Sequence, residues 1–243
     1  MDEVRLSKES WGATILLARP PVNALSTPLL QRLAAVLAEL VDARPNLVVI
    51  TGDGGCFSAG ADIKERYTRP EDIWTRLQSG QRVLDLLRAA PFPTLAAVDG
   101  YCLGGAMNII ANCDLRVASD AATFGNPEIK VGRAGGTACL RGLLPEGTIR
   151  WLALTGDTID AATAERLGFV QKVFPAASWP ADLDALAERI SGYGGSGLYT
   201  IKEGLQRTQS MSARDGQWTE QQLTYRLFLE GARAQLPAEG TAA

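Results

Sequence analysis

Two hydrophobic patterns alternate along the first 190 residues of the chain. Continuous apolar runs at residues 47–51 and 94–98 are typical of strands that are buried on both faces of a sheet. Between such runs, apolar residues recur at the spacing of one helix face, most clearly at Leu29, Leu30, Leu33, Val36, Leu37 and Leu40. Ser26 or Thr27 can cap this helix, and Pro28 suits its first position.

The same patterns predict further elements in this part of the chain. Strands are expected at residues 4–6, 13–18 and 115–118, and helices at residues 70–88 and 103–111. Strands that alternate with helices favour an α/β fold with a largely parallel sheet.

After Gly147 the predicted elements are all helices. They lie at residues 148–155, 160–167, 182–190, 198–207 and 217–234. The glycine-rich stretch 191–197 is expected to form a hinge or loop before the last two. We therefore predict a core domain over residues 1–190 and a helical region over residues 191–243 that is used in assembly, with residues 237–243 frayed at its end.

Charge and composition exclude several classes of function. The 24 basic and 27 acidic side chains give a net charge of −3, which leaves no basic excess for nucleic-acid binding. The chain contains no histidine, which excludes Ser-His-Asp and Cys-His nucleophiles, His-based metal sites and an imidazole base. Acid–base chemistry near neutral pH must then come from carboxylates, Lys, Tyr, Cys or backbone groups.

The cysteines and the apolar runs indicate where in the cell the protein is located. The four cysteines form no C-x-x-C pair and are expected to be reduced, mostly buried thiols, with a reactive thiol as the alternative. The N-terminus lacks an apolar signal core, and no run approaches the roughly 20 apolar residues of a membrane span. A cytoplasmic protein without a membrane span is predicted.

Two glycine-rich segments each follow a predicted buried strand and lead into a polar or helical start. Residues 51–62 read TGDGGCFSAGAD, and residues 99–108 read DGYCLGGAMN. The first is not a P-loop, because no Gly-Lys-Ser/Thr follows, and it does not complete a dinucleotide-binding fingerprint. Tight turns are one interpretation; the other is that their backbone N–H groups stabilise one oxyanion, with each donor worth about 2.7–4 kcal/mol.

Several segments, taken in chain order, make the sequence similar to the crotonase, or enoyl-CoA hydratase/isomerase, superfamily. They are RPPVNAL at 19–25, ITG at 50–52, FSAGADIK at 57–64, AVDGYCLGG at 97–105, CD at 113–114, FGNPE at 124–128 and LTG at 154–156. The resemblance spans roughly residues 12–175, and the C-terminal helices match only loosely.

The resemblance implies a fold of repeated β-β-α turns with a C-terminal helical trimerisation region. Members bind acyl-CoA thioesters as substrates, need no further cofactor or metal, and form homotrimers or dimers of trimers. The family's oxyanion hole maps onto the backbone N–H groups of Ala61 and Gly105. CoA contacts are implied for the segment Ala59, Gly60, Ala61, Asp62, Ile63 and Lys64. Lys64 is either a phosphate contact or a solvated surface lysine.

The chain departs from the family's hydratases at one catalytic position. Hydratases use two glutamates; the second aligns with Glu128, and the first aligns with Asn108, which cannot transfer a proton at neutral pH. Loss of a general acid or base costs about 10²–10⁴-fold in rate. A lone Glu128, with Asn108 as a positioning group, favours isomerisation of an enoyl-CoA double bond. The alternatives are an atypical hydratase or decarboxylase, and an acyl-CoA-binding protein without turnover.

A second departure is a shortened loop after Glu128, where residues 129–134 replace a longer family segment. Lys130 and Arg133 lie in this loop, and either pairs with Glu128, which would lower its pKa, or is solvated. Tyr101 and Asp99 are alternative acids, although a packing role and a turn role are the simpler interpretations of these two.

Overall fold

The computed structural model describes residues 3–235, and the chain divides into two compact units, Met1–Gly192 and Tyr193–Ala243. The first unit ends within the glycine-rich stretch 191–197. The predicted frayed end, residues 237–243, lies outside the described residues.

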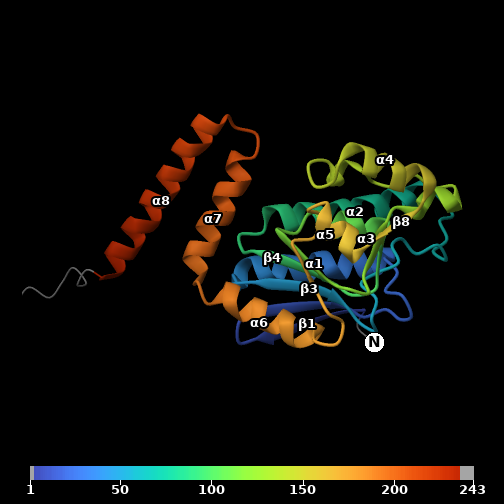
Figure 1. Ribbon diagram of the computed structural model, residues 1–243, viewed down its shortest axis with the longest axis horizontal. Coiled ribbons are helices and arrows are strands. Elements are labelled where there is room, and N and C mark those ends of the chain that lie inside the picture. Colours follow the sequence, from blue (N-terminus) through green and yellow to red (C-terminus); the bar gives the residue numbers. More distant parts are fainter. Residues whose placement is uncertain (1–2, 236–243) are drawn as a thin grey trace, which may run out of the picture. The chain divides into compact units, whose positions relative to one another are not determined.

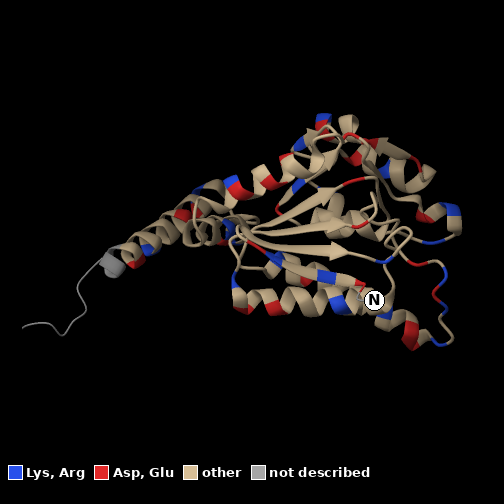
Figure 2. Cartoon of the chain, turned by 90° about the horizontal axis from the view of Figure 1, so that it is seen from below, with Lys and Arg blue, Asp and Glu red and all other residues tan. Residues whose placement is uncertain are grey.

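The main sheet of the first unit is almost entirely parallel. Its strands, in spatial order, are β1 (Val4–Glu9), β2 (Gly12–Leu17), β3 (Val48–Gly52), β4 (Thr94–Val98), β6 (Leu115–Ser119) and β9 (Lys172–Phe174). Only the hairpin pair β1 and β2 is antiparallel among them. The two central strands β3 and β4 carry no charged residue (Figure 2), as expected for strands buried on both faces.

A second, smaller sheet consists of β5 (Tyr101–Leu103), β7 (Thr123–Gly125) and β8 (Thr158–Asp160), in the order β5-β7-β8. β5 follows β4 and β7 follows β6, so that the chain passes from the main sheet into the second sheet twice before it turns into a helix. This is the repeated β-β-α arrangement that the resemblance implied. The sequence pattern did not predict β5, β7 or β8, because three residues are too few to show an alternation.

Helices cover the main sheet (Figure 1). In the first unit they are α1 (Thr27–Ala43), α2 (Pro70–Ala89), α3 (Gly105–Ala111), α4 (Glu146–Thr155), α5 (Ala161–Arg166) and α6 (Trp179–Ser191), with 3₁₀ turns η1 (Pro127–Val131) and η2 (Ala138–Leu140). The predicted start of α1 is confirmed, because the Ser26 hydroxyl accepts a hydrogen bond from the Leu29 N–H at 3.2 Å. α1 and α2 pack against each other.

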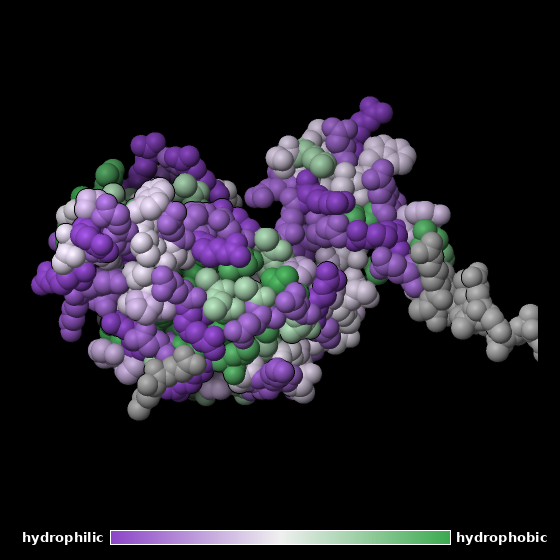
Figure 3. Space-filling model, turned by 180° about the vertical axis from the view of Figure 1, so that it is seen from behind, coloured by the Kyte–Doolittle hydropathy of each residue, from purple (hydrophilic) through white to green (hydrophobic). Residues whose placement is uncertain are grey.

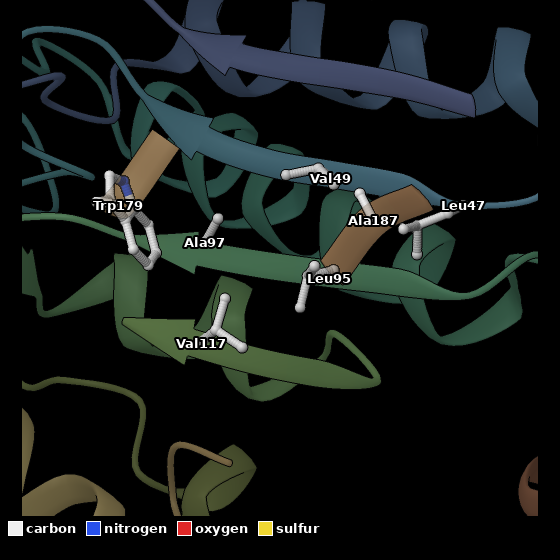
Figure 4. Close-up of a cluster of buried hydrophobic side chains, with 7 residues drawn as sticks. All are labelled: Leu47, Val49, Leu95, Ala97, Val117, Trp179 and Ala187. Atoms are coloured by element: carbon white, nitrogen blue, oxygen red, sulfur yellow. The ribbon is translucent and has the colours of Figure 1, made fainter. Parts of the chain in front are cut away.

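One face of the main sheet is closed by α6 (Figure 4). The side chains in this cluster are Leu47, Val49, Leu95, Ala97, Val117, Trp179 and Ala187. Val48 and Ile50, the alternate residues of β3, point to the opposite face and are also buried. Burial of each large apolar side chain contributes about 1.5–3 kcal/mol, so this cluster holds the strand ends, and the loops that follow them, in fixed positions.

Several predicted helix starts are wrong by a few residues, and two of them have a clear local reason. Leu103 was expected in a helix but ends β5, and Gly104 then turns the chain with φ +55°, so that α3 begins at Gly105. α6 begins at Trp179 rather than at residue 182, because Pro180 fits the first turn of a helix.

The second unit consists of α7 (Gly195–Thr208) and α8 (Ala213–Gln235), which pack against each other. Glu203 on α7 forms ion pairs with Arg207 on the same helix and with Arg226 on α8. Large apolar side chains on both helices are exposed within the chain: Ile201, Leu205, Trp218, Tyr225 and Phe228.

The surface of the first unit is mostly polar, with a patch of apolar side chains visible from one side (Figure 3). Exposed apolar residues of this unit include Ile73, Trp74 and Leu77 on α2. None of the helices within the described residues is long and apolar enough to cross a membrane.

Candidate active site

The two glycine-rich segments lie directly against each other. The Ser58 N–H donates to the Tyr101 carbonyl at 2.8 Å, and the Leu103 N–H donates to the Ser58 carbonyl at 3.0 Å. A Cβ on Gly60 would lie 2.5 Å from the Leu103 oxygen, and a Cβ on Gly100 would lie 2.1 Å from the Gly55 oxygen. Only glycine permits this approach, which brings together two loops about 45 residues apart in sequence.

The backbone around Ala61 is held by a short parallel pairing with Leu25. The Leu25 N–H donates to the Gly60 carbonyl at 2.8 Å, and its carbonyl accepts from the Asp62 N–H at 3.3 Å. In a parallel pairing the central residue directs its own N–H to the other side of the strand. The Ala61 N–H is therefore not used by this pairing.

Gly105 is the first residue of α3, where a backbone N–H has no acceptor within the helix. The preceding Gly104 is fixed by its N–H, which donates to the Gly125 carbonyl at 2.8 Å. A side chain on Gly104 would collide with Glu128, because its Cβ would lie 2.7 Å from Oε1. The start of α3 and Glu128 are thus in direct contact.

Ala61, Gly105, Asn108 and Glu128 all line one cavity of about 530 Å³. The whole lining comes from α1, α2, α3, η1 and the loops around them: Leu25, Leu30, Ala61, Tyr67, Ile73, Arg76, Leu77, Gly80, Gln81, Leu84, Gly105, Asn108, Ile109, Glu128, Arg133, Ala134, Gly135 and Gly136. Its walls are mainly apolar, which suits an acyl chain. The residues that the sequence singled out from three separate segments are therefore brought together.

The Glu128 carboxylate is enclosed between two glycines. A Cβ on Gly135 would lie 2.6 Å from its Cδ, so the carboxylate lies against the Gly135 backbone as well as that of Gly104. Its Oε2 is buried and has no hydrogen-bond partner among the described residues. Burial raises the pKa of Glu128 above the ordinary value of a glutamic acid. A buried carboxylate with one free oxygen and a raised pKa has the properties of a general base.

Asn108 lies one turn into α3, and its amide lies against Gly136, where a Cβ would be 2.5 Å from Nδ2. Its Oδ1 is buried and, within residues 3–235, has no hydrogen-bond partner. The carboxylate and the amide thus line the same cavity with one free oxygen each. Free polar atoms in an apolar cavity are available to a ligand or to water.

Comparison with known proteins gives the family. The Enoyl-CoA hydratase/isomerase family profile matches residues 9–240. The chain belongs to this family. It is 36% identical over 234 residues to a probable enoyl-CoA hydratase of Mycobacterium bovis, covering 93% of this chain and 90% of that protein. It is 32% identical to a 2,3-dehydroadipyl-CoA hydratase of Escherichia coli, covering 92% and 89% of the two chains.

Solved structures share the fold. The crystal structure of an enoyl-CoA hydratase from Bacillus anthracis superposes with a TM-score of 0.87 at 28% identity, covering 96% of this chain and 95% of that one. The α/β fold with a helical C-terminal region, expected from the resemblance, is confirmed.

The pairing of Glu128 with Lys130 or Arg133 is not found in this family member. Within the described residues neither cation forms an ion pair with Glu128, and the pKa of Glu128 is raised rather than lowered. The Lys130 stem packs instead against Gly156, where a Cβ would lie 2.8 Å from Cε. The Arg133 N–H donates to the Glu128 carbonyl at 3.0 Å, which holds the short loop closed.

The two alternative acids lie elsewhere. Tyr101 is 55% exposed at the start of β5, and the Asp99 carboxylate accepts the Ser119 hydroxyl at 2.5 Å. Neither is among the described residues that line the cavity. Residues 3–235 also contain no cluster of Asp, Glu and Cys side chains that could hold a metal ion.

Sequence reasoning missed the group that supports the Ala61 segment. An Arg19 guanidinium nitrogen donates to Oδ2 of Asp62 at 2.6 Å, and the Lys64 N–H donates to Oδ1 at 2.8 Å. Burial opposes ionisation of Asp62, but these hydrogen bonds and the Arg19 charge together lower its pKa. The Asp62 side chain is thus bound to Arg19 and to the Lys64 N–H, and these contacts fix the backbone directly after Ala61. We call the Arg19–Asp62 ion pair the brace of the Ala61 segment.

Ala59, Gly60, Ile63 and Lys64 complete the segment expected to contact CoA. Ala59 is half-buried, Gly60 is buried, and Ile63 is 61% exposed. Lys64 is exposed and, among the described residues, forms no ion pair. The segment thus has a buried side that contacts residues 19–25 and an exposed side that a ligand can reach.

Proposed function

We propose that this member of the enoyl-CoA hydratase/isomerase family isomerises the double bond of an enoyl-CoA thioester, with Glu128 as the only acid–base group. The observation that supports this most directly is the single carboxylate of the cavity. Its Oε2 has no hydrogen-bond partner among the described residues and its pKa is raised, whereas an amide, Asn108, lies at the other catalytic position. One base is sufficient for isomerisation, whereas hydration by the family's usual route uses two glutamates.

In the proposed reaction, Glu128 removes a proton from the carbon between the thioester and the double bond of a 3-enoyl-CoA. The electron pair moves onto the thioester oxygen, forming a dienolate, and the backbone N–H groups of Ala61 and Gly105 stabilise that oxyanion. Protonated Glu128 then returns the proton two carbons further along the chain. The product is the conjugated 2-enoyl-CoA, and Glu128 is again ionised.

The backbone N–H groups of Ala61 and Gly105 are held in position for the oxyanion before the substrate binds. Each donor of this kind contributes about 2.7–4 kcal/mol to the transition state. The Leu25 pairing and the Arg19–Asp62 ion pair hold the Ala61 segment, and the Gly104–Gly125 hydrogen bond holds the start of α3. Both donors are thus on braced backbone, which supports their assignment as the oxyanion hole.

CoA is proposed to bind along Ala59, Gly60, Ala61, Asp62, Ile63 and Lys64, with the adenine near this stretch. The exposed Ile63 side chain and the exposed Lys64 ammonium support the proposal. Lys64 either contacts a phosphate or stays solvated, and Lys64→Met distinguishes the two by the affinity for free CoA.

Hydration by an atypical route is the second candidate, because the M. bovis and E. coli relatives are named as hydratases. In that case the amide of Asn108 orients a water molecule that Glu128 activates. Decarboxylation of an acyl-CoA and acyl-CoA binding without turnover remain the further alternatives.

Assembly into a homotrimer or a dimer of trimers is proposed for the helices α7 and α8. Their exposed apolar side chains, such as Trp218 and Phe228, are of the kind that subunit contacts bury. A cytoplasmic location is proposed as well, since Cys56, Cys102, Cys113 and Cys139 are all free thiols.

The test is incubation with trans-3-hexenoyl-CoA, following the ultraviolet absorbance of the conjugated thioester. Conversion by the wild type and its loss in Glu128→Ala support the proposal. No conversion, or equal conversion by both proteins, refutes it. Asn108→Glu is the complementary variant: a large gain in hydration of a 2-enoyl-CoA would show that the native chain lacks the second catalytic acid.

A further inference from the structure

The cavity contains cations that the isomerisation does not use. Arg76 on α2, Arg133 in the loop after η1, and Tyr67 in the loop before α2 all line it. The reaction proposed above needs only Glu128 and two backbone donors. These three polar side chains therefore need a separate explanation.

The cations and the phenol form one electrostatic group. The Tyr67 hydroxyl donates to Oε2 of Glu65 at 3.1 Å; burial raises the pKa of Tyr67, and the charges of Arg76 and Arg133 partly offset this rise. Arg76 lies 3.9 Å from the same Glu65 oxygen, with its side chain 15% exposed. Glu65 also accepts the Thr27 N–H at 3.1 Å.

Arg76 and Arg133 bring two positive charges to the cavity, and Glu65 beside Arg76 and Glu128 in the cavity wall bring two negative charges. Glu65 is already shared between Arg76, Tyr67 and the Thr27 N–H. Arg133 is half-buried and, within residues 3–235, forms no ion pair. Arg133 thus lines the cavity without an ion-pair partner among the described residues, because Glu128 in the same wall does not pair with it.

The rest of the cavity makes the Arg133 charge unfavourable for a simple fatty acyl group. Leu25, Leu30, Leu77, Leu84 and Ile109 give it apolar walls. An aliphatic chain that filled it would remove water from Arg133 and offer no acceptor in exchange. A carboxylate would accept two parallel hydrogen bonds from the planar guanidinium.

We propose that Arg133, flanked by Arg76 and Tyr67, binds a carboxylate on the acyl group, so that the substrates are CoA thioesters of dicarboxylic acids. The inference rests on the proposed function, in that the acyl group occupies this cavity with its thioester at Ala61 and Gly105. Arg133 is then a specificity-determining residue. Its backbone N–H bond to the Glu128 carbonyl ties the recognition group to the loop of the base.

Binding of non-reacting thioesters tests the inference without relying on turnover. Matched saturated pairs are glutaryl- and valeryl-CoA, adipoyl- and hexanoyl-CoA, and suberoyl- and octanoyl-CoA, measured by isothermal titration calorimetry. In at least one pair the wild type should prefer the dicarboxylate by about 10- to 100-fold, the worth of a charged hydrogen-bonded contact. Arg133→Met should abolish the preference, and Arg133→Lys should retain part of it.

Lys130→Met is the matched control, because Lys130 lies in the same loop, packs against Gly156 and does not line the cavity. It should keep the wild-type preference. Circular dichroism of each variant verifies that it is folded. Equal affinity of the wild type for both members of every pair overturns the inference. So does an equal loss of affinity for both thioesters in Arg133→Met, which would place Arg133 on a CoA phosphate.

Turnover separates this inference from the proposed function. A dicarboxylate preference in binding, without conversion of trans-3-hexenedioyl-CoA, would support Arg133 as the carboxylate contact and refute isomerisation. Equal conversion of trans-3-hexenoyl-CoA and trans-3-hexenedioyl-CoA, with the same KM, would support isomerisation and refute the carboxylate contact.

Discussion

The position of the Glu128 carboxylate is set by a glycine that makes no hydrogen bond to it. A Cβ on Gly135 would lie 2.6 Å from Cδ of Glu128 and 2.7 and 2.8 Å from its two oxygens. Gly135 is not in the left-handed backbone region, so alanine is compatible with its conformation. Gly135→Ala therefore displaces the carboxylate without straining the backbone.

The size of the effect follows from the contact distance. An ordinary contact of a Cβ begins at 3.4 Å, so the Glu128 carboxylate must move by about 0.8 Å. Misplacement of a reacting group by about 1 Å costs on the order of 10²-fold in rate. We expect kcat for isomerisation to fall by roughly this factor, with little change in KM.

The assay is steady-state isomerisation of trans-3-hexenoyl-CoA or its dicarboxylate counterpart, with thermal unfolding measured in parallel. Gly147→Ala on α4 is the control, because no atom lies within 4 Å of a Cβ there, and it should leave kcat unchanged. If Gly135→Ala is folded and as active as the wild type, the carboxylate is not confined as described, and the reasoning fails.

Two further predictions concern ionisation and the brace. Because burial raises the pKa of Glu128, kcat/KM should fall in acid, with a midpoint above the ordinary glutamate value of 4.5. For the same reason, the Glu128→Gln variant should unfold at a higher temperature than the wild type at pH 7, but not in acid, where Glu128 is protonated. The sign follows because a raised carboxyl pKa makes folding less favourable as pH rises. Arg19→Met leaves the Asp62 charge unpaired and should cost about 1–3 kcal/mol in urea unfolding and lower kcat through the Ala61 segment. A pH profile with a midpoint at or below 4.5, or an Arg19→Met variant of native stability, would contradict these expectations.

Elements with a long periodic pattern were predictable from the sequence. The α1 helix shows this, since its apolar residues recur over several turns and Ser26 caps it as expected. β5, β7 and β8 were not predictable, because each has three residues and is defined by pairing with segments far along the chain. Local sequence carries little information on such pairs.

The residues of the site likewise fall into those that the sequence could predict and those that it could not. Glu128, Asn108 and the glycine loops stand out as motifs, and the structure brings them into one cavity. The Arg19–Asp62 brace joins residues 43 positions apart, so no local spacing reveals it. Arg133 was noticed in the sequence only as a partner for Glu128, and its place beside Tyr67 depends on how the loop folds.

The central claim is that a cavity with Glu128 as its one catalytic carboxylate favours isomerisation over hydration. The most direct measurement compares kcat/KM for isomerisation of trans-3-enoyl-CoA with that for hydration of trans-2-enoyl-CoA in one enzyme preparation, for both the monocarboxylic and the dicarboxylic thioesters. Isomerisation should exceed hydration by about 10²-fold or more, the cost of the missing second carboxylate. Hydration as fast as isomerisation, or faster, would contradict the account.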